Sequence, residues 1–300
     1  MRAICPKCNS THIQKKGVVY SKGFECNVQR YKCVGCCKQF QVPRDSPKVD
    51  LPKILLFDIE TAPMEVYVWG LYKQFIPHTN IIKDSEGEEK SWYVLSWAAK
   101  WLYDENVVSD IVTPEETKKR DDKRVLESIW KLLDEADIVI GHNGDRFDLR
   151  KLNARFIDNN IKPPSPFRTI DTLKVARREF AFVSYKQDYL TKHFKLEQKL
   201  STEFQLWVDC IHGNQKRLDE MEEYNRHDVM GLEEVYLKLR PYIKNHPNLG
   251  VLMDQDVCPN CGCEFLDETD TSYFTSANKF PVYRCQGCKT PYIRHKKNSN

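Results

Sequence analysis

The chain has 300 residues, of which 41% are hydrophobic and 30% are charged, and its formal net charge is +3. This composition is typical of a globular protein with a full core, and no apolar run approaches the roughly 20 residues that span a bilayer. The first residues, MRAICPKCNS, lack the apolar stretch of a signal peptide, so we expect a cytoplasmic protein of a bacterium, or of a host cell if the source is a virus. In that reducing compartment the 12 cysteines are expected to bind metal rather than to form disulfides.

The charge is unevenly distributed along the chain. Residues 1–50 contain ten Lys/Arg against three Asp/Glu, and residues 251–300 contain six of each, which leaves the middle with a net charge of −4. A basic N-terminal segment favours a polyanionic partner, because phosphate contacts supply much of the affinity for nucleic acid. The alternative is that these charges serve solubility alone.

The N-terminal segment, residues 1–44, contains two C-x-x-C pairs separated by short β-type runs. Each pair forms a tight knuckle with two thiolates, and two knuckles close a tetrahedron of sulfurs around Zn²⁺. A module of this size buries little core, so the metal would supply much of its folding free energy. Cys37 directly follows a ligand candidate and could replace a neighbour, whereas Cys26 is expected to be a packed apolar residue. The predicted ligands are Cys5, Cys8, Cys33 and Cys36.

The stretches CPKCNSTHIQKKGVVYSKG and QRYKCVGCCKQF resemble the zinc ribbons at the start of insertion-sequence transposases and related DNA-binding proteins. The resemblance covers about the first 44 residues and departs from that pattern at Cys37, where a glycine is usual. It implies contact with nucleic acid.

The proline-containing stretch 41–52 is predicted to be a linker, and a single domain is expected over residues 50–245. The domain opens with KILLFDIET, a continuous apolar run typical of a strand buried on both faces. Because alternate side chains of a strand share a face, Asp58 and Glu60 point the same way. Two adjacent negative charges within a sheet call for a divalent cation. The alternative is that the strand has already ended at Asp58.

A second apolar strand is predicted at residues 137–141, followed by a loop with Gly141 and Gly144 and a helix that starts near Arg146. Asp148 then falls in the first helical turn, where a carboxylate is also favoured by the helix dipole alone. Asp171 is expected to cap the helix that follows it. Residues 177–199 interleave basic and aromatic side chains, which suits either a path for a single strand or, at helical spacing, a core.

The stretch YNRHDVMGLEEVY, residues 224–236, places Tyr224 and Asp228 four apart, on the same face of a predicted helix. His227 lies about 100° around that helix from Asp228, so we interpret it as a surface or packing residue. The alternative for Tyr224 is a packed aromatic residue of an amphipathic helix.

After a second predicted linker, residues 244–256, the C-terminal segment 254–297 repeats the cysteine pattern with CPNC and CQGC. Four such pairs, ordered two and two, favour a second zinc module over redox pairs. Cys263 could replace a neighbouring ligand, and Cys210 is expected to be packed. The predicted ligands are Cys258, Cys261, Cys285 and Cys288.

Three motifs in order, DIE, HNGDRFD and YNRHD, strongly resemble those of the DEDD superfamily of 3′-to-5′ exonucleases. The resemblance covers residues 53–240 and implies an α/β ribonuclease H-like fold with a mixed five-stranded sheet and flanking helices. A tyrosine four before the last aspartate marks the DEDDy branch, which includes proofreading domains of family B DNA polymerases, whereas the histidine branch would have its histidine at Glu223. Within that branch the chain is most similar to stand-alone exonucleases of bacteria and phages.

The resemblance implies a catalytic set and two Mg²⁺ or Mn²⁺ ions, together with the two structural Zn²⁺. We expect Asp58 to bridge both ions, Glu60 and Asp228 to hold the ion that activates water, and Asp148 to hold the other. The hydroxyl of Tyr224 would orient the water, because a free pKa near 10 makes tyrosine a poor base at neutral pH. Asn143 is a candidate substrate contact. The catalytic set is Asp58, Glu60, Asp148, Tyr224 and Asp228.

The predicted reaction removes nucleotides from a 3′ end by a two-metal-ion mechanism and releases nucleoside 5′-monophosphates. The expected partner is nucleic acid, DNA in preference to RNA, with replication or repair proteins as further candidates and no membrane. Two alternatives stay open. One is a ribonuclease on the same fold, and the other is a non-catalytic scaffold whose zinc ribbons bind nucleic acid.

Overall fold

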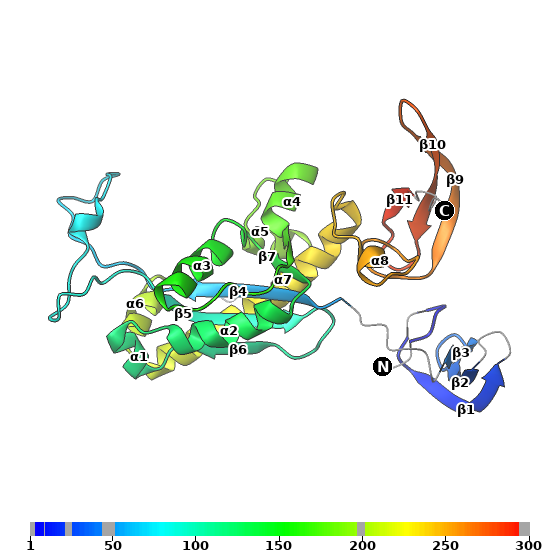
Figure 1. The fold of residues 1–300 in the computed structure, drawn as a ribbon, viewed down its shortest axis with the longest axis horizontal. Helices are drawn as coiled ribbons and strands as arrows, with labels where there is room; N and C mark the ends of the chain where they lie inside the picture. Colours follow the sequence, from blue (N-terminus) through cyan, green and yellow to red (C-terminus); the bar gives the residue numbers. More distant parts are fainter. Residues whose placement is uncertain (1–3, 9, 22–25, 44–51, 197–201, 294–300) are drawn as a thin grey trace. The chain divides into compact units, whose positions relative to one another are not determined.

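The computed structural model describes residues 4–8, 10–21, 26–43, 52–196 and 202–293 (Figure 1). The chain divides into two compact units, residues 1–51 and residues 52–300, which are described separately. Most of the stretch 41–52 predicted as a linker, the last residues of the stretch 177–199 and the side chain of Cys26 lie outside the described residues.

The N-terminal unit is an antiparallel sheet of three strands in the order β1-β2-β3. The strands are β1 (Ile13–Ser21), β2 (Cys26–Cys33) and β3 (Gln39–Pro43). Among its described side chains only Cys5, Val28 and Cys33 are buried. The described part of this unit thus buries few side chains, which fits a module held together by metal.

The second unit is built on a mixed sheet of five strands in the order β6-β5-β4-β7-β8. Strand β4 is central and pairs antiparallel with β5 and parallel with β7, while β6 adds antiparallel to β5 and β8 adds parallel to β7. This confirms the predicted α/β class with a mixed five-stranded sheet. The strands are β4 (Ile54–Thr61), β5 (Val94–Trp101), β6 (Val108–Ile111), β7 (Ile138–Gly141) and β8 (Arg168–Asp171).

Strand β4 is buried on both faces, as its unbroken apolar run predicts. Leu55, Phe57 and Ile59 belong to one cluster of buried side chains, and Ile54 and Leu56 belong to another. By the two-residue period of a strand, the carboxylates at positions 58 and 60 therefore continue the row of Ile54 and Leu56. The strand runs on to Thr61, so both acids lie inside it and the alternative of an earlier strand end is excluded.

Helices cover both faces of this sheet (Figure 1). The long helix α7 contacts both clusters: residues of its first half lie in the cluster with Leu55, and residues of its second half lie in the cluster with Ile54. It thereby crosses the sheet next to β4 and β5. The helices are α1 (Pro114–Lys119), α2 (Lys123–Glu135), α3 (Asp148–Asp158), α4 (Thr172–Glu179), α5 (Gln187–His193), α6 (Gln205–Ile211), α7 (Gln215–Leu239) and the short η2 (Arg240–Tyr242).

An arm of residues 62–93 separates β4 from β5 and includes the short helix η1 (His78–Asn80). Its base is held by Glu65, which pairs with Lys90 at 2.9 Å and with Arg120 at 2.5 Å. Elsewhere the aromatic side chains of residues 180–194 are partly buried against the core, and Phe180 stacks on Phe182 with ring centroids 4.9 Å apart. These aromatic side chains therefore pack against the core, whereas Val183 between them is 93% exposed.

The C-terminal sheet has three antiparallel strands in the order β11-β10-β9, with β9 (Leu266–Phe274), β10 (Lys279–Cys285) and β11 (Pro291–Ile293). The stretch predicted as the second linker instead contains helix α8 (Leu249–Leu252), which Asn248 caps. Asn260, between two of the cysteines, is buried and donates to the carbonyls of Arg240 and Ile243 at 3.0 and 3.2 Å. The cysteine module is thus hydrogen-bonded to the end of α7 and η2, a contact that sequence spacing does not reveal.

Within the described residues, none of the helices combines the length and the apolar character needed to cross a membrane.

Candidate functional site

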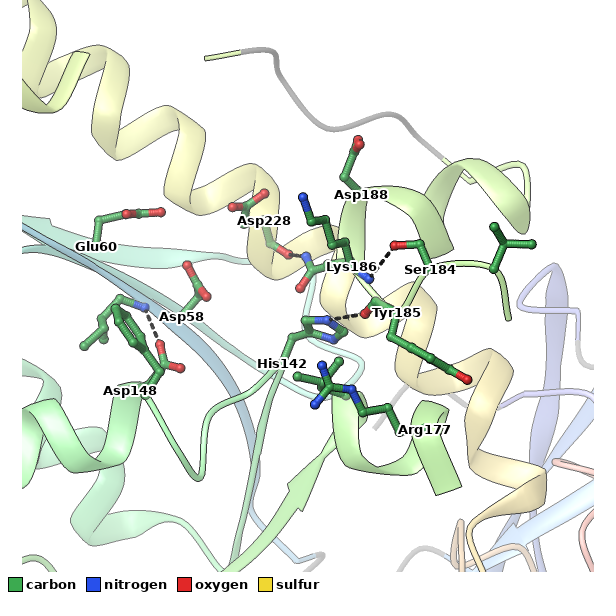
Figure 2. Close-up of a pocket in the computed structure, with 15 residues that line it drawn as sticks. Asp58, Glu60, His142, Asp148, Arg177, Ser184, Tyr185, Lys186, Asp188 and Asp228 are labelled. Atoms are coloured by element: carbon green, nitrogen blue, oxygen red, sulfur yellow. Dashed lines mark hydrogen bonds between the residues drawn. The ribbon is translucent and has the colours of Figure 1, made fainter. Parts of the chain in front are cut away.

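Carboxylates from distant parts of the chain meet where β4 ends. Asp58 and Glu60 project from β4 and Asp228 from α7, and each offers an oxygen that lies within 4.8 Å of the other two (Figure 2). Three hard oxygen ligands so close together match the preference of Mg²⁺ and Mn²⁺. The donor set of this acidic triad therefore fits a divalent cation.

Asp148, in the first turn of α3, lines the same 680 Å³ cavity as the triad. Its Oδ1 accepts a hydrogen bond from the backbone N–H of Ile59 at 3.2 Å, which ties α3 to β4. Burial raises the pKa of Asp148 to about 7, and the charge of Asp171 adds to this rise while the Ile59 N–H opposes it. Asp148 thus lies in the cavity of the triad but is not one of the acids whose oxygens come within 4.8 Å of one another, so its predicted role as a metal ligand stays a prediction.

The loop before α3 brings the backbone into a close approach that favours glycine. A Cβ on Gly141 would lie 3.1 Å from the Cα of Gly144, and one on Gly144 would lie 3.2 Å from the Cα of Gly141. Asn143 has a φ of +70°, and its N–H donates to Asp171 Oδ1 at 3.0 Å. Asp171 also accepts from Leu173 N at 3.0 Å, which confirms the predicted cap of α4.

Asn143 itself does not line the cavity of the triad. It lines a neighbouring cavity of 270 Å³, which shares Leu173 and Arg177 with the cavity of the triad. The substrate contact of Asn143 stays a prediction, and such a contact would lie in the neighbouring cavity.

Tyr224 lies one helical turn before Asp228, as predicted, but only 5% of it is exposed. Its ring packs edge-on against Trp207 with centroids 5.9 Å apart, and it does not line the cavity of the triad. Trp207 in turn donates from Nε1 to Glu60 Oε2 at 3.1 Å. The predicted role of Tyr224 in orienting a water stays a prediction. In the structure, Tyr224 packs against Trp207, and Trp207 hydrogen-bonds to Glu60.

Sequence reasoning missed the residues that hold the acids in place. Asn225 is fully buried and donates from Nδ2 to Asp58 Oδ2 at 2.7 Å, and it accepts from Ser96 Oγ at 3.3 Å. Gln187 donates to the backbone carbonyl of Asp228 at 2.7 Å. The only sequence signal for Asn225 was its place beside Tyr224, within the YNRHD motif.

Helix α7 is held against the sheet by an ion pair and by a hydrogen bond at different points along the helix. Lys100 of β5 forms a largely buried ion pair with Glu233, and Ser109 of β6 donates to Glu222 at 2.7 Å. Because these pairs hold α7 in one register, the Asp228 side chain faces the end of β4. His227 is half-buried on the same helix and is not among the residues that line the cavity.

A third cavity, of 380 Å³, adjoins the triad on the side of Glu60 and Phe147. Its walls are mainly apolar and aromatic, with Trp92, Phe204 and Trp207. The ammonium of Lys151 lies 3.9 Å from the ring centroid of Trp92, a cation–π contact.

Both predicted cysteine sets come together as tetrads, each with its four sulfurs within 4.8 Å of one another. Cys5 and Cys36 have their sulfurs 3.5 Å apart, and the sulfurs of Cys258 and Cys288 are 3.6 Å apart. A tetrahedral Zn²⁺ with Zn–S bonds near 2.3 Å places its sulfurs about 3.8 Å apart, so the spacing fits zinc and excludes a disulfide. The tetrads are Cys5, Cys8, Cys33 and Cys36, and Cys258, Cys261, Cys285 and Cys288.

The two cysteines considered as substitute ligands, Cys37 and Cys263, belong to neither tetrad. Cys37 is exposed with a φ of +57°, and the corresponding residue of the other module, Lys289, has a φ of +65°. The knuckle needs a left-handed residue at this position, which explains why glycine is usual there. Cys210 is buried in the cluster that contains Leu55, as expected.

A search of protein families matches residues 100–240 to the RNase H superfamily. The matched region includes Asp148 and Asp228 but begins after Asp58 and Glu60. This part of the chain is thus similar to RNase H superfamily domains, which agrees with the mixed five-stranded sheet and suggests nucleic-acid processing. No curated protein matches the chain.

Proposed function

We propose that this protein is a metal-dependent 3′-to-5′ exonuclease that acts on nucleic acid, with DNA as the preferred substrate. The observation that carries the proposal is the meeting of Asp58, Glu60 and Asp228 within 4.8 Å, with Asp148 in the same cavity. These acids come from three separate motifs of the sequence, and the fold brings them to one place. Structural ion pairs do not require such a convergence of like charges.

In this proposal the acidic triad and Asp148 hold two Mg²⁺ or Mn²⁺ ions. Bound there, the ions would activate a water and stabilise the charge that develops on the scissile phosphate. Asn225 keeps Asp58 oriented, and Trp207 does the same for Glu60. Such outer contacts fix the ligand oxygens before substrate arrives, as outer-shell partners of metal sites commonly do.

The aromatic cavity beside Glu60 supports a nucleotide substrate. Its apolar walls suit the face of a base, and stacking on aromatic side chains is tolerant of sequence. A terminal nucleotide with its base in this cavity would have its 5′ phosphate near the triad, since both cavities share Glu60 and Phe147.

The two cysteine tetrads are proposed to hold structural zinc. The N-terminal module presents exposed Lys15, Lys16 and Arg30 on its strands, and these cations suit contact with a phosphate backbone. The C-terminal module is hydrogen-bonded to the end of α7 and η2, so we assign it a bracing role for the domain that carries the acids.

The test is digestion of matched single-stranded DNA and RNA, labelled at either end, in Mg²⁺ or Mn²⁺. Asp58→Asn and Asp228→Asn should each lower the initial rate by about 100-fold or more, because each removes a charged ligand. Asp219→Asn is the matched control, since Asp219 lies on the same helix α7 but is exposed. Its rate should equal that of the wild type.

Mononucleotide 5′-phosphates should appear from the first time point with a 3′ label. Faster loss of RNA than of DNA would reassign the enzyme as a ribonuclease. Equal rates for the wild type and Asp58→Asn would contradict the proposal, and tight binding without digestion would favour a scaffold.

A further inference from the structure

The 270 Å³ cavity next to the triad is lined by four cationic side chains together with Asn143 and Leu173. Arg146 comes from the loop before α3, and the other three come from helix α4. This basic cavity is unexpected in a part of the chain whose net charge is negative. Its cations are Arg146, Lys174, Arg177 and Arg178.

The four cations are not all neutralised by neighbouring acids. Lys174 pairs with Asp145 at 2.6 Å, and Arg178 pairs with Glu179 at 2.7 Å. Arg146 and Arg177 are exposed and have no acidic partner among the residues that the structure describes. Two exposed guanidinium groups are therefore available to bind oxyanions, which they do in bidentate fashion.

The basic cavity is continuous with the site of the acids, since Arg177 and Leu173 line both. The aromatic cavity adjoins the same site through Glu60 and Phe147 and shares no lining residue with the basic cavity. The acids thus have a cationic neighbour on one side and an aromatic neighbour on another. Figure 2 shows Arg177 beside Tyr185 and His142 at the edge of the cavity that holds the acids.

The number of phosphates decides which part of a nucleic-acid strand fits the basic cavity and which part fits the aromatic cavity. A 3′-terminal nucleotide brings one phosphate, the scissile one, whereas the strand that remains after cleavage brings a phosphate with every nucleotide. Only Lys151 is cationic among the residues that line the aromatic cavity, and its ammonium lies against Trp92. The phosphate-rich part therefore fits the basic cavity.

We propose that the basic cavity is a binding site for the phosphates of the retained strand, and that it sets the direction of the substrate. The strand lies with its 5′ continuation over Arg146 and Arg177 and its 3′-terminal base toward Trp92 and Phe147. This inference rests on the proposed exonuclease function, because the acids define where the scissile phosphate lies.

The test uses the full chain with Asp58→Asn, so that bound strands stay intact. Binding of single strands of two to eight nucleotides is measured over a range of salt concentrations, with and without Arg146→Gln and Arg177→Gln together. Arg168→Gln is the matched control. Arg168 is also an exposed arginine, but it lies at the start of β8, whereas α4 begins beyond the other end of that strand, where Asp171 caps it.

Each phosphate contact contributes about 0.7 to the slope of log affinity against log salt for single strands. With an octanucleotide, the magnitude of this slope should therefore be smaller by about 1.4 in the double variant and unchanged in Arg168→Gln. A dinucleotide, whose one phosphodiester is the scissile one, should bind the double variant as it binds the parent. A neutral methylphosphonate linkage one step to the 5′ side of the scissile phosphate should weaken binding to the parent and have little effect on the double variant.

An unchanged slope and an unchanged length dependence in the double variant would overturn the binding site. Weakening by the neutral linkage in the parent and the double variant alike would overturn the assigned direction. The two proposals fail separately. Digestion by the wild type with an unaltered slope would refute the basic cavity and leave the nuclease standing, whereas a reduced slope without any digestion would refute the nuclease and leave only the phosphate contacts of the basic cavity.

Discussion

Replacing Asn225 tests whether the buried contacts of the site hold the acids for metal binding. Asn225 is fully buried, and its side chain donates a 2.7 Å hydrogen bond to Asp58 Oδ2. Asn225→Leu keeps the branching at Cγ and the number of heavy atoms but removes this bond, so Asp58 loses a donor that fixes its orientation. A hydrogen bond to a charged group contributes about 1.5 to 3 kcal/mol. At about 1.4 kcal/mol per factor of ten, Mn²⁺ affinity should fall by roughly 10- to 100-fold, the range typical of an outer partner of a metal ligand.

The assay is calorimetric titration of Mn²⁺, with the initial rate of digestion as a second readout. Ser96→Ala gives a graded comparison, because its longer 3.3 Å bond to Asn225 joins two neutral groups. A hydrogen bond between neutral groups contributes about 1 kcal/mol, so the Mn²⁺ affinity of Ser96→Ala should fall only about fivefold. Mn²⁺ affinity of Asn225→Leu within twofold of the wild type, in a protein that still folds, would refute the reasoning.

Three further outcomes concern stability. Arg155→Met should lower the free energy of unfolding by about 3 to 5 kcal/mol in urea titrations, because Asp122 is fully buried and loses two 2.8 Å bonds. Burial lowers the pKa of His246 to about 4, below an unfolded value of about 6.5, so stability should fall as the pH drops from about 6.5 to about 4, by at most about 3 kcal/mol. Cys261→Ser should lower the unfolding temperature of the central domain, whereas Cys36→Ser should not, because only Cys261 belongs to the compact unit that contains α7.

Each of these outcomes has its own control. Arg124→Met removes half-exposed ion pairs and should lose about 1 kcal/mol or less, so an equal loss in both arginine variants would contradict the special role of the buried pair. His246→Gln removes the titrating group. If this variant lost the same stability between about pH 6.5 and about pH 4, the loss would come from another group and the prediction would be wrong. Equal shifts of unfolding temperature in the two cysteine variants would contradict the bracing role of the C-terminal module.

The sequence was sufficient wherever local periodicity carries the information. Asp58 and Glu60 are two residues apart in a strand, and Tyr224 and Asp228 are four apart in a helix, so their shared faces follow from backbone geometry. The cysteine pairs were recognisable for the same reason, since a knuckle is a local structure.

The sequence was insufficient where a contact depends on three-dimensional packing. Asn225 is 167 residues from Asp58, and Trp207 is 147 residues from Glu60, so no spacing rule could pair them. The basic cavity joins Arg146 to residues of α4 only because β7 and β8 are neighbours in the sheet. The contact of Asn260 with the end of α7 and η2 was hidden in the same way, behind a stretch predicted to be a linker.

The most direct measurement is the stoichiometry of Mn²⁺ at the site of the acids, determined by titration of the zinc-loaded protein and located by anomalous diffraction. We expect two Mn²⁺ per chain beside Asp58, and none in the double variant Asp58→Asn, Asp228→Asn. Wild-type crystals grown in Mn²⁺ with no ion within bonding distance of these two carboxylates would contradict the account.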